Sequence, residues 1–302
     1  MGFFVLANIK LENLNGGKLN TNNDQQLRIG ELPRLKIVSI KNITFHEKPD
    51  EERSSKLIEY LRKENRLKNP PVVARHDGSA RLILLDGANR ITALNKLNIP
   101  DVLVQEIDLF DAGLIFLHWH HVFEHFTRES FLNELTKLPD ISITKFETNS
   151  LKHKENGDLL CQVQFGDGSV YAVHAHENLF QRIKDLKNIT NIYKGSQYMD
   201  RVSYTNLDHL KKNYPDFCAL IVFRKITKEE LVDITQKDEK VPSGITRIIL
   251  PKRALRINVP LDILRFDISI NQKNHWLKKR INDQIKDKSI RFYHEPTFLF
   301  DE

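Results

Sequence analysis

The 302-residue sequence predicts an α+β protein, with a small N-terminal unit of strands and helices followed by a mixed α/β unit. Two observations support this fold class. Segments with the period of a strand and segments with the period of a helix occur in both halves of the chain. Turn signals of the Asp-Gly type join neighbouring strands into hairpins in both halves. We find no internal repeat.

The first compact unit is expected over residues 35–110, after an N-terminal extension, residues 1–34, that is rich in Asn, Gly and Gln and therefore reads as a surface segment. The stretch LKIVSIKNI, residues 35–43, predicts a strand. DEERSSKLIEYLRKENRL, residues 50–67, predicts a helix, because its leucines and isoleucine share one face. The unit therefore begins with a strand and an amphipathic helix.

A hairpin and a strand–turn–helix element complete this unit. PPVVARHDGSARLILL, residues 70–85, predicts a hairpin that turns at Asp77-Gly78. LLDGANRITALNKL, residues 84–97, reads as the end of a strand, a tight turn and the start of a helix. DVLVQEID, residues 101–108, predicts the last strand.

Residues 111–140 are expected to form a helical segment that bridges to the second unit, because residues 111–138 show helical periodicity. In that helix His121 and His125 would be four residues apart on one face and could ligate a metal ion. No third ligand is evident, so we assign no metal site.

The second unit, residues 141–302, is expected to be a mixed α/β domain that completes the substrate site. Residues 159–175 predict a hairpin around Gly-Asp-Gly, and CALIVFR, residues 218–224, predicts a buried strand. Thr227 and Glu230 form a capping box that predicts a helix start. A closing block, VPSGITRIILPKRALRINVPLDIL, alternates apolar and basic residues.

Composition narrows the class of function. The net charge of +6 and the pI near 9.1 favour an anionic partner such as a nucleotide, phosphate or nucleic acid. The two cysteines lie far apart, which indicates neither a disulfide framework nor a zinc knuckle and fits a reducing compartment. No segment approaches the roughly 20 apolar residues of a spanning helix, so we expect a cytoplasmic protein without a membrane partner.

The DGANR turn is the first candidate site. Gly87 permits an unusual backbone angle, and the free N–H groups of residues 87–90 would point at one spot and bind a phosphate. Arg90 could add a charge-assisted contact, and Asp86 could hold a metal ion or orient a hydroxyl group. The alternative is that Asp86 caps the helix and Arg90 is solvated.

The segment from ITFHEK to DVLVQEID resembles the ParB/sulfiredoxin-like domain: an HE turn, a helix, a Pro-Pro strand entry, a hairpin, a DGxxR turn and a last strand. Within that superfamily it is most similar to the free serine kinase branch, which transfers phosphate from ATP or ADP to free L-serine. The block VPSGITR resembles the C-terminal PxGxTR segment of that branch, which partition proteins lack. The resemblance covers roughly residues 36–265.

This resemblance implies a role for each matching residue. Glu47 in FHEK would be the catalytic carboxylate, and Asp86 would lie near the transferred phosphate or its Mg²⁺. The backbone of Gly87, Ala88, Asn89 and Arg90 would hold the nucleotide phosphates. Trp119 would form an aromatic wall of the serine pocket. Thr246 and Arg247 would meet the amino acid or its new phosphate.

The sequence departs from the family pattern at the turn. The family reads DGHHR, whereas Ala88 and Asn89 replace the two histidines, and TRI replaces the commoner TRH. Phosphate binding through backbone N–H groups would survive these changes, but histidine contacts would not. The leading hypothesis is an ATP- or ADP-dependent, Mg²⁺-dependent kinase that makes O-phosphoserine. A ParB-like nucleotide-dependent DNA-binding regulator and a catalytically silent ligand-binding homologue are the alternatives, although no helix-turn-helix is evident.

Overall fold

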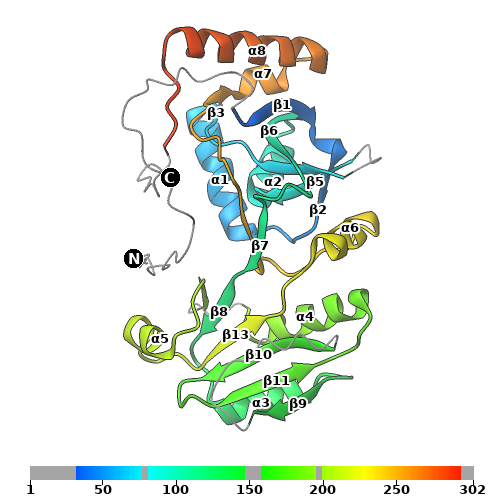
Figure 1. Cartoon of the computed structure of the whole chain (residues 1–302), viewed down its shortest axis with the longest axis vertical. Coiled ribbons are helices and arrows are strands. Elements are labelled where there is room, and N and C mark those ends of the chain that lie inside the picture. Colours follow the sequence, from blue (N-terminus) through cyan, green and yellow to red (C-terminus); the bar gives the residue numbers. More distant parts are fainter. Residues whose placement is uncertain (1–31, 77–80, 147–157, 195–198, 294–302) are drawn as a thin grey trace.

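The computed structural model describes residues 32–76, 81–146, 158–194 and 199–293, and these form two units placed one above the other along the longest axis (Figure 1). The first unit contains a five-stranded sheet with the order β1-β6-β4-β5-β2. Its strands are β1 (Arg34–Ser39), β2 (Ile43–Phe45), β4 (Val72–Arg75), β5 (Leu82–Asp86) and β6 (Asp101–Asp108), with a short helical turn, η2 (Ile40–Asn42), between the first two. The antiparallel pairing of β4 with β5 confirms the predicted hairpin, whose turn lies outside the described residues.

Two helices, α1 (Glu51–Glu64) and α2 (Ala88–Lys96), cover one face of this sheet because each presents an apolar stripe to it. Leu61 of α1 and Leu94 of α2 are fully buried there. The side chain of Asp50 caps α1 by accepting a hydrogen bond from the Arg53 N–H. The amino-terminal ends of both helices therefore lie beside the carboxyl ends of β2 and β5.

The second unit contains a six-stranded sheet with the order β12-β8-β13-β10-β11-β9. Its strands are β8 (His120–Phe123), β9 (Ser142–Lys145), β10 (Leu159–Phe165), β11 (Val170–His174), β12 (Met199–Val202) and β13 (Ala219–Phe223). Helices α3 (Arg128–Thr136) and α4 (Leu179–Tyr193) pack on one face, and α5 (Leu207–Asn213) packs on the other. The predicted hairpin of β10 with β11 and the predicted strand β13 are confirmed.

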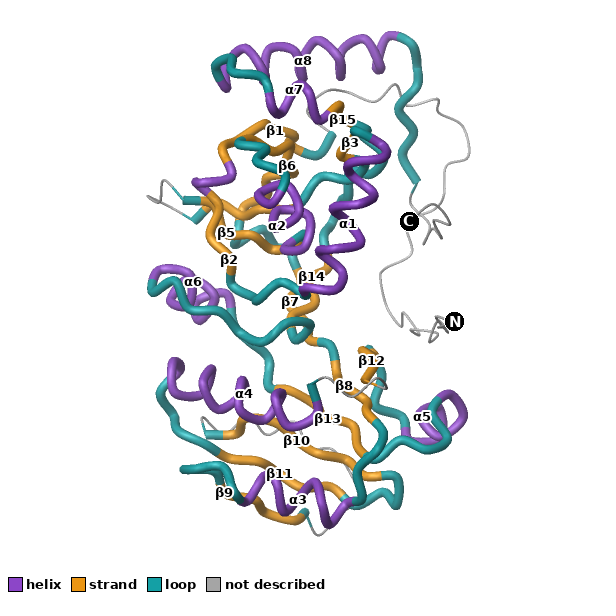
Figure 2. Tube along the Cα trace, turned by 180° about the vertical axis from the view of Figure 1, so that it is seen from behind, coloured by secondary structure: helices purple, strands orange, loops and turns teal. Residues whose placement is uncertain are grey.

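Helix α6 (Lys228–Gln236) joins the two units, as Figure 2 shows from behind. Its Leu231 and Val232 pack on the open face of the first sheet, whereas Ile234 packs against Ile183 of α4 in the second unit. The predicted capping box of Thr227 with Glu230 is present at its start. This helix thus brings the segment that follows it, residues 241–249, up to the first unit.

The prediction of a helix over residues 111–138 is wrong in its first half. That half forms the strands β7 (Ile115–His118) and β8, and only α3 is helical. The strand β8 lies between β12 and β13, and all four of its residues are buried. Pairing with these distant strands outweighs the local helical period, so His121 and His125 do not share a helix face.

The assignment of all residues after 140 to the second unit is also wrong, because the last described elements pack on the first unit. Strand β15 (Val259–Pro260) pairs with β3 (Arg66–Leu67), and helices α7 (Leu261–Arg265) and α8 (Ile270–Lys286) lie over β1 and β6 in Figure 1. Leu264 and Leu277 are buried in the core of the first unit. Within the described residues, no helix combines the length and apolarity needed to cross a bilayer.

Candidate active site

Glu47 follows β2, and hydrogen bonds from the second half of the chain hold its carboxylate. The backbone N–H of Gly244 donates to Oε1 at 2.7 Å, and the N–H of Thr246 donates to Oε2 at 3.0 Å. The Thr246 hydroxyl also donates to Oε2. Backbone hydrogen bonds between residues 46–48 and Val241 align the two segments. Three donors are therefore directed at one carboxylate.

The His46 side chain lies between β5 and Thr246 and contacts both. Its Nδ1–H donates to the Leu84 carbonyl at 2.6 Å, and its Nε2, 2.9 Å from the Thr246 hydroxyl oxygen, competes with Glu47 Oε2 for the single proton of that hydroxyl. Burial lowers the pKa of His46, which keeps the imidazole neutral at pH 7. The ring ties β5 of the first unit to strand β14 (Thr246–Ile249), which pairs with β7.

The DGANR turn has the predicted strand–turn–helix form. Gly87 is the N-cap of α2 with φ of 102°, and no side chain among the described residues caps the first turn. A Cβ at Gly87 would lie 2.8 Å from the Cβ of Pro71, so both the backbone angle and the space require glycine. The N–H groups at the start of α2 are thus left for a ligand.

The side chains of this turn are engaged within the protein. Arg90 donates to Asp86 Oδ2 at 2.7 Å and to the carbonyls of Asn69 and Pro70, each at 3.1 Å. Arg253 forms a second ion pair with the same Asp86 oxygen. Burial would raise the pKa of Asp86, but the charges of the two arginines outweigh it and lower the pKa to about 2. Asp86 is therefore ionised at neutral pH.

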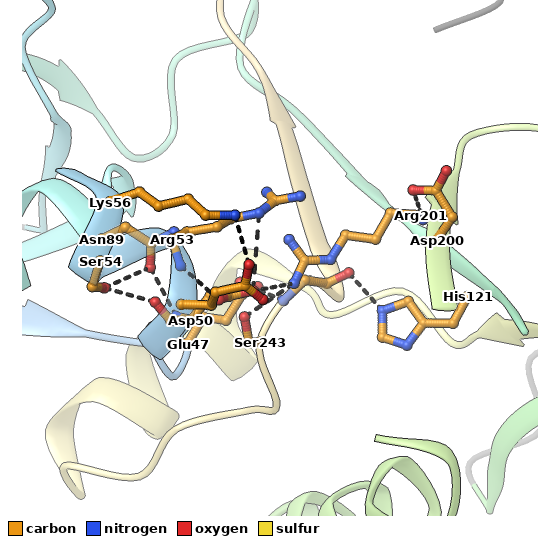
Figure 3. Close-up of polar contacts among 12 residues, drawn as sticks. Glu47, Asp50, Arg53, Ser54, Lys56, Asn89, His121, Asp200, Arg201 and Ser243 are labelled. Carbon is orange, nitrogen blue, oxygen red and sulfur yellow. Dashed lines mark hydrogen bonds and ion pairs between the residues drawn. The ribbon is translucent and has the colours of Figure 1, made fainter. Parts of the chain in front are cut away.

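Asn89, which stands where the family has a histidine, joins the starts of the two helices. Its Oδ1 accepts a hydrogen bond from the Asp50 N–H at 2.8 Å and from the Ser54 hydroxyl at 3.3 Å (Figure 3). The amide therefore supports the site without reaching a phosphate through its oxygen.

Trp119, between β7 and β8, and Arg247, in β14, lie side by side where the two units meet. The Arg247 guanidinium lies 4.8 Å from the centroid of the Trp119 ring, within the range of a cation–π contact. The backbone N–H of Trp119 donates to the Ile245 carbonyl at 2.8 Å, which aligns the two segments. Burial lowers the pKa of Arg247, although an arginine remains charged at neutral pH.

Eight of the nine residues singled out from the sequence line one cavity of about 350 Å³. They are Glu47, Asp86, Gly87, Ala88, Asn89, Arg90, Trp119 and Thr246. Arg247 lines a neighbouring groove of about 670 Å³, whose walls share Asp86, Trp119 and Thr246 with the cavity. The structure therefore brings all nine residues to two adjoining spaces.

Several residues that also line these spaces are not among the nine. His46, Ser243 and Gly244 belong to the quoted FHEK and VPSGITR motifs, so their neighbours in the sequence could have indicated them. Arg53 and Arg201 line the cavity, and Arg253 lines the groove. No motif surrounds Arg201, so only the tertiary structure identifies it.

Comparison with known proteins gives relatives along most of the chain. No family profile matches. The ATP-dependent L-serine kinase SbnI of Staphylococcus aureus is 23% identical over 270 residues, which cover 89% of this chain and 97% of that protein. An ATP-dependent L-serine kinase of Staphylothermus marinus is 23% identical over 241 residues, with coverage of 76% and 90%.

Solved structures share the fold. SbnI of Staphylococcus aureus with a C-terminal truncation superposes with a TM-score of 0.67 at 21% identity, covering 83% of this chain and 96% of that one. A free serine kinase in complex with AMP superposes with a TM-score of 0.64 at 17% identity, covering 76% and 93%. The predicted fold class is confirmed. The chain is thus similar along most of its length to the ATP-dependent L-serine kinases and shares their fold.

Proposed function

We propose that this chain is a kinase that transfers a phosphoryl group from ATP to the hydroxyl of free L-serine and so forms O-phosphoserine. Its similarity to two ATP-dependent L-serine kinases supports the reaction. One observation supports it most: the carboxylate of Glu47, held by donors from Gly244 and Thr246, lines the same cavity as the uncapped start of α2. A proton acceptor and a phosphate-binding element thus face one space.

Glu47 is the proposed general base. A carboxylate has about four lone-pair sites, and the donors from Gly244 and Thr246 use three of them, which leaves one for the hydroxyl of serine. As the serine oxygen bonds to the γ-phosphorus, its proton passes to Glu47, and the bond from phosphorus to the ADP oxygen breaks. Phosphoryl transfer depends chiefly on the positioning of the reacting groups and on the stabilisation of charge. The three hydrogen bonds fix the orientation of the Glu47 carboxylate in the cavity.

The start of α2 is the proposed phosphate-binding element. The N–H groups of residues 88–90 and the helix dipole favour an anion there, and neither needs the histidines that Ala88 and Asn89 replace. Arg90 contributes positive charge, although its guanidinium is anchored to Asp86 and to two backbone carbonyls. We therefore expect backbone contacts to dominate nucleotide binding.

The donor set suits a magnesium ion that arrives with the nucleotide. Mg²⁺ is commonly bound by one or two carboxylates, water and substrate phosphates. Both ion pairs of Asp86 use Oδ2, so Oδ1 has no partner among the described residues and is the proposed ligand. No group of three metal-ligating side chains occurs in the described part of the chain, in keeping with an ion held mainly by phosphates. When bound, it would neutralise phosphate charge.

The acceptor is proposed to lie against Trp119, Thr246 and Arg247, at the wall that the cavity and the groove share. Arg247, stacked on Trp119, would contact the amino acid or its new phosphate. Both cysteines are free thiols, which is consistent with a reducing compartment, and we place the reaction in the cytoplasm.

The decisive experiment is to incubate the purified chain with Mg²⁺, ATP or ADP, and a panel of amino acids, and to detect new phosphoesters by phosphorus NMR. We expect O-phosphoserine with ATP. O-phosphoserine formation with ADP but not with ATP would mean that ADP is the phosphoryl donor. Nucleotide binding without any phosphoester would favour the catalytically silent homologue, and nucleotide-dependent retention of DNA, weakened steeply by salt, would favour the ParB-like regulator.

A further inference from the structure

Arg201 is a half-buried arginine of the cavity, and the proposed mechanism gives it no role. It lies on β12 in the second unit, and its side chain is only 17% exposed. A Cβ on Gly244 would lie 1.9 Å from its Nε, and Gly244 has φ of 81°. The glycine therefore leaves the space in which the guanidinium packs on the turn that holds Glu47.

Arg201 feels the charge of three carboxylates, Glu47, Asp50 and Asp200, but its guanidinium makes only two direct polar contacts among the described residues. Its Nη2 lies 3.5 Å from Asp50 and donates to the Ser243 hydroxyl at 3.2 Å (Figure 3). Its Nε and Nη1 have no hydrogen-bond partner among the described residues. Burial lowers the pKa of Arg201 and the nearby charge of Arg53 lowers it further, whereas the carboxylates of Glu47, Asp50 and Asp200 act in the opposite direction. A half-buried guanidinium with free donors and one long ion pair is suited to receive an anion.

The size of the acceptor indicates which anion this is. In serine, three bonds separate the hydroxyl oxygen from the carboxyl carbon, so a group that binds the carboxylate must lie close to the base. Arg201 meets this condition because it packs on Gly244, whose N–H donates to Glu47. Arg247 instead stacks on Trp119 and lines the neighbouring groove. The start of α2 already offers a separate place for the nucleotide phosphates.

We propose, on the basis of the function above, that Arg201 binds the carboxylate of the amino-acid acceptor and is a specificity-determining residue of the site. The second unit would then supply the group that recognises an amino acid, while the first unit supplies the base and the phosphate-binding turn. A hydrogen bond to a charged group contributes about 1.5–3 kcal/mol, which corresponds to roughly 10- to 100-fold in affinity.

The test measures kcat and KM for serine, and the Kd of ATP, in the wild type, Arg201→Met and Arg201→Lys. We expect Arg201→Met to raise the KM for serine about 10- to 100-fold, with a Kd for ATP within about threefold of the wild type. Arg201→Lys keeps the charge without the planar fork and should restore part of the loss. Arg128→Met, which removes an exposed arginine of the same unit, is the matched control and should change neither constant.

A purely structural role is tested with Asp50→Asn. Asparagine also caps helices well, so this variant removes the ion pair with Arg201 while it keeps the start of α1. If Arg201 binds serine, Asp50→Asn leaves the KM for serine unchanged or lowers it. An increase equal to that of Arg201→Met would mean that the arginine only joins the two units, and would overturn the proposal.

The remaining outcomes are also distinct. An active wild type whose KM for serine does not respond to Arg201→Met or Arg201→Lys would refute the role of Arg201 alone. An increase in the Kd of ATP with an unchanged KM for serine would assign Arg201 to the nucleotide phosphates instead. A wild type that forms no O-phosphoserine would refute the proposed function, and the inference about Arg201 with it.

Discussion

Replacement of Glu47 by glutamine changes one atom of the site and removes the proposed base. The carboxylate accepts one hydrogen bond on Oε1 and two on Oε2, all from Gly244 and Thr246. The amide oxygen of glutamine can serve the two donors of Thr246, but its NH₂ group then faces the N–H of Gly244, a donor against a donor. The variant therefore loses the base and one hydrogen bond of the turn.

The two losses have different sizes and different readouts. General-base catalysis is worth about 10²- to 10⁴-fold in rate, so kcat should fall by that factor. The lost charge-assisted hydrogen bond should cost about 1.5–3 kcal/mol of stability, a fall in Tm of several degrees. The start of α2 is unaffected, so the Kd of ATP should stay within about threefold.

The assay is O-phosphoserine formation at saturating ATP and serine, with the Kd of ATP measured by calorimetry and Tm by thermal unfolding. Glu59→Gln removes an exposed carboxylate of α1 and is the control for charge alone. A Glu47→Gln variant with the kcat of the wild type would remove Glu47 from the mechanism. A variant that loses ATP binding as strongly as turnover would show that Glu47 positions the nucleotide.

Three further predictions concern the turn, the acceptor wall and the core. Gly87→Val should weaken ATP binding at least tenfold, because φ of 102° and the nearby Pro71 exclude a side chain; unchanged binding by calorimetry in a folded variant would argue against the turn as the phosphate site. Arg247→Lys should raise the KM for serine more than that for ATP, since lysine lacks the planar fork; equal effects on both would contradict a role at the acceptor. Lys273→Met should destabilise the protein by about 3–5 kcal/mol in denaturant unfolding, because Lys273 is 1% exposed and pairs with Asp101 at 2.6 Å; a loss below about 1 kcal/mol would contradict this.

Local patterns were sufficient for much of the first unit. The DGANR turn depends on a glycine that adopts a positive φ and on a helix that begins at the next residue, and both are properties of a few adjacent residues. The strand over residues 101–108 and the capping box of Thr227 with Glu230 were correct for the same reason. The resemblance added Glu47, Trp119 and Thr246, and the structure gathers these around one cavity.

Contacts between distant residues decided the rest. The sequence alone determined where α1, α2 and α6 begin, because capping and turn formation act over a few residues. Only the tertiary structure decided that β8 is a strand, since its hydrogen bonds go to β12 and β13, about 80 and 100 residues later. Only the tertiary structure placed Arg201 on the turn of Gly244, and Glu47 against Thr246 from 199 positions away, because such contacts depend on how whole units pack.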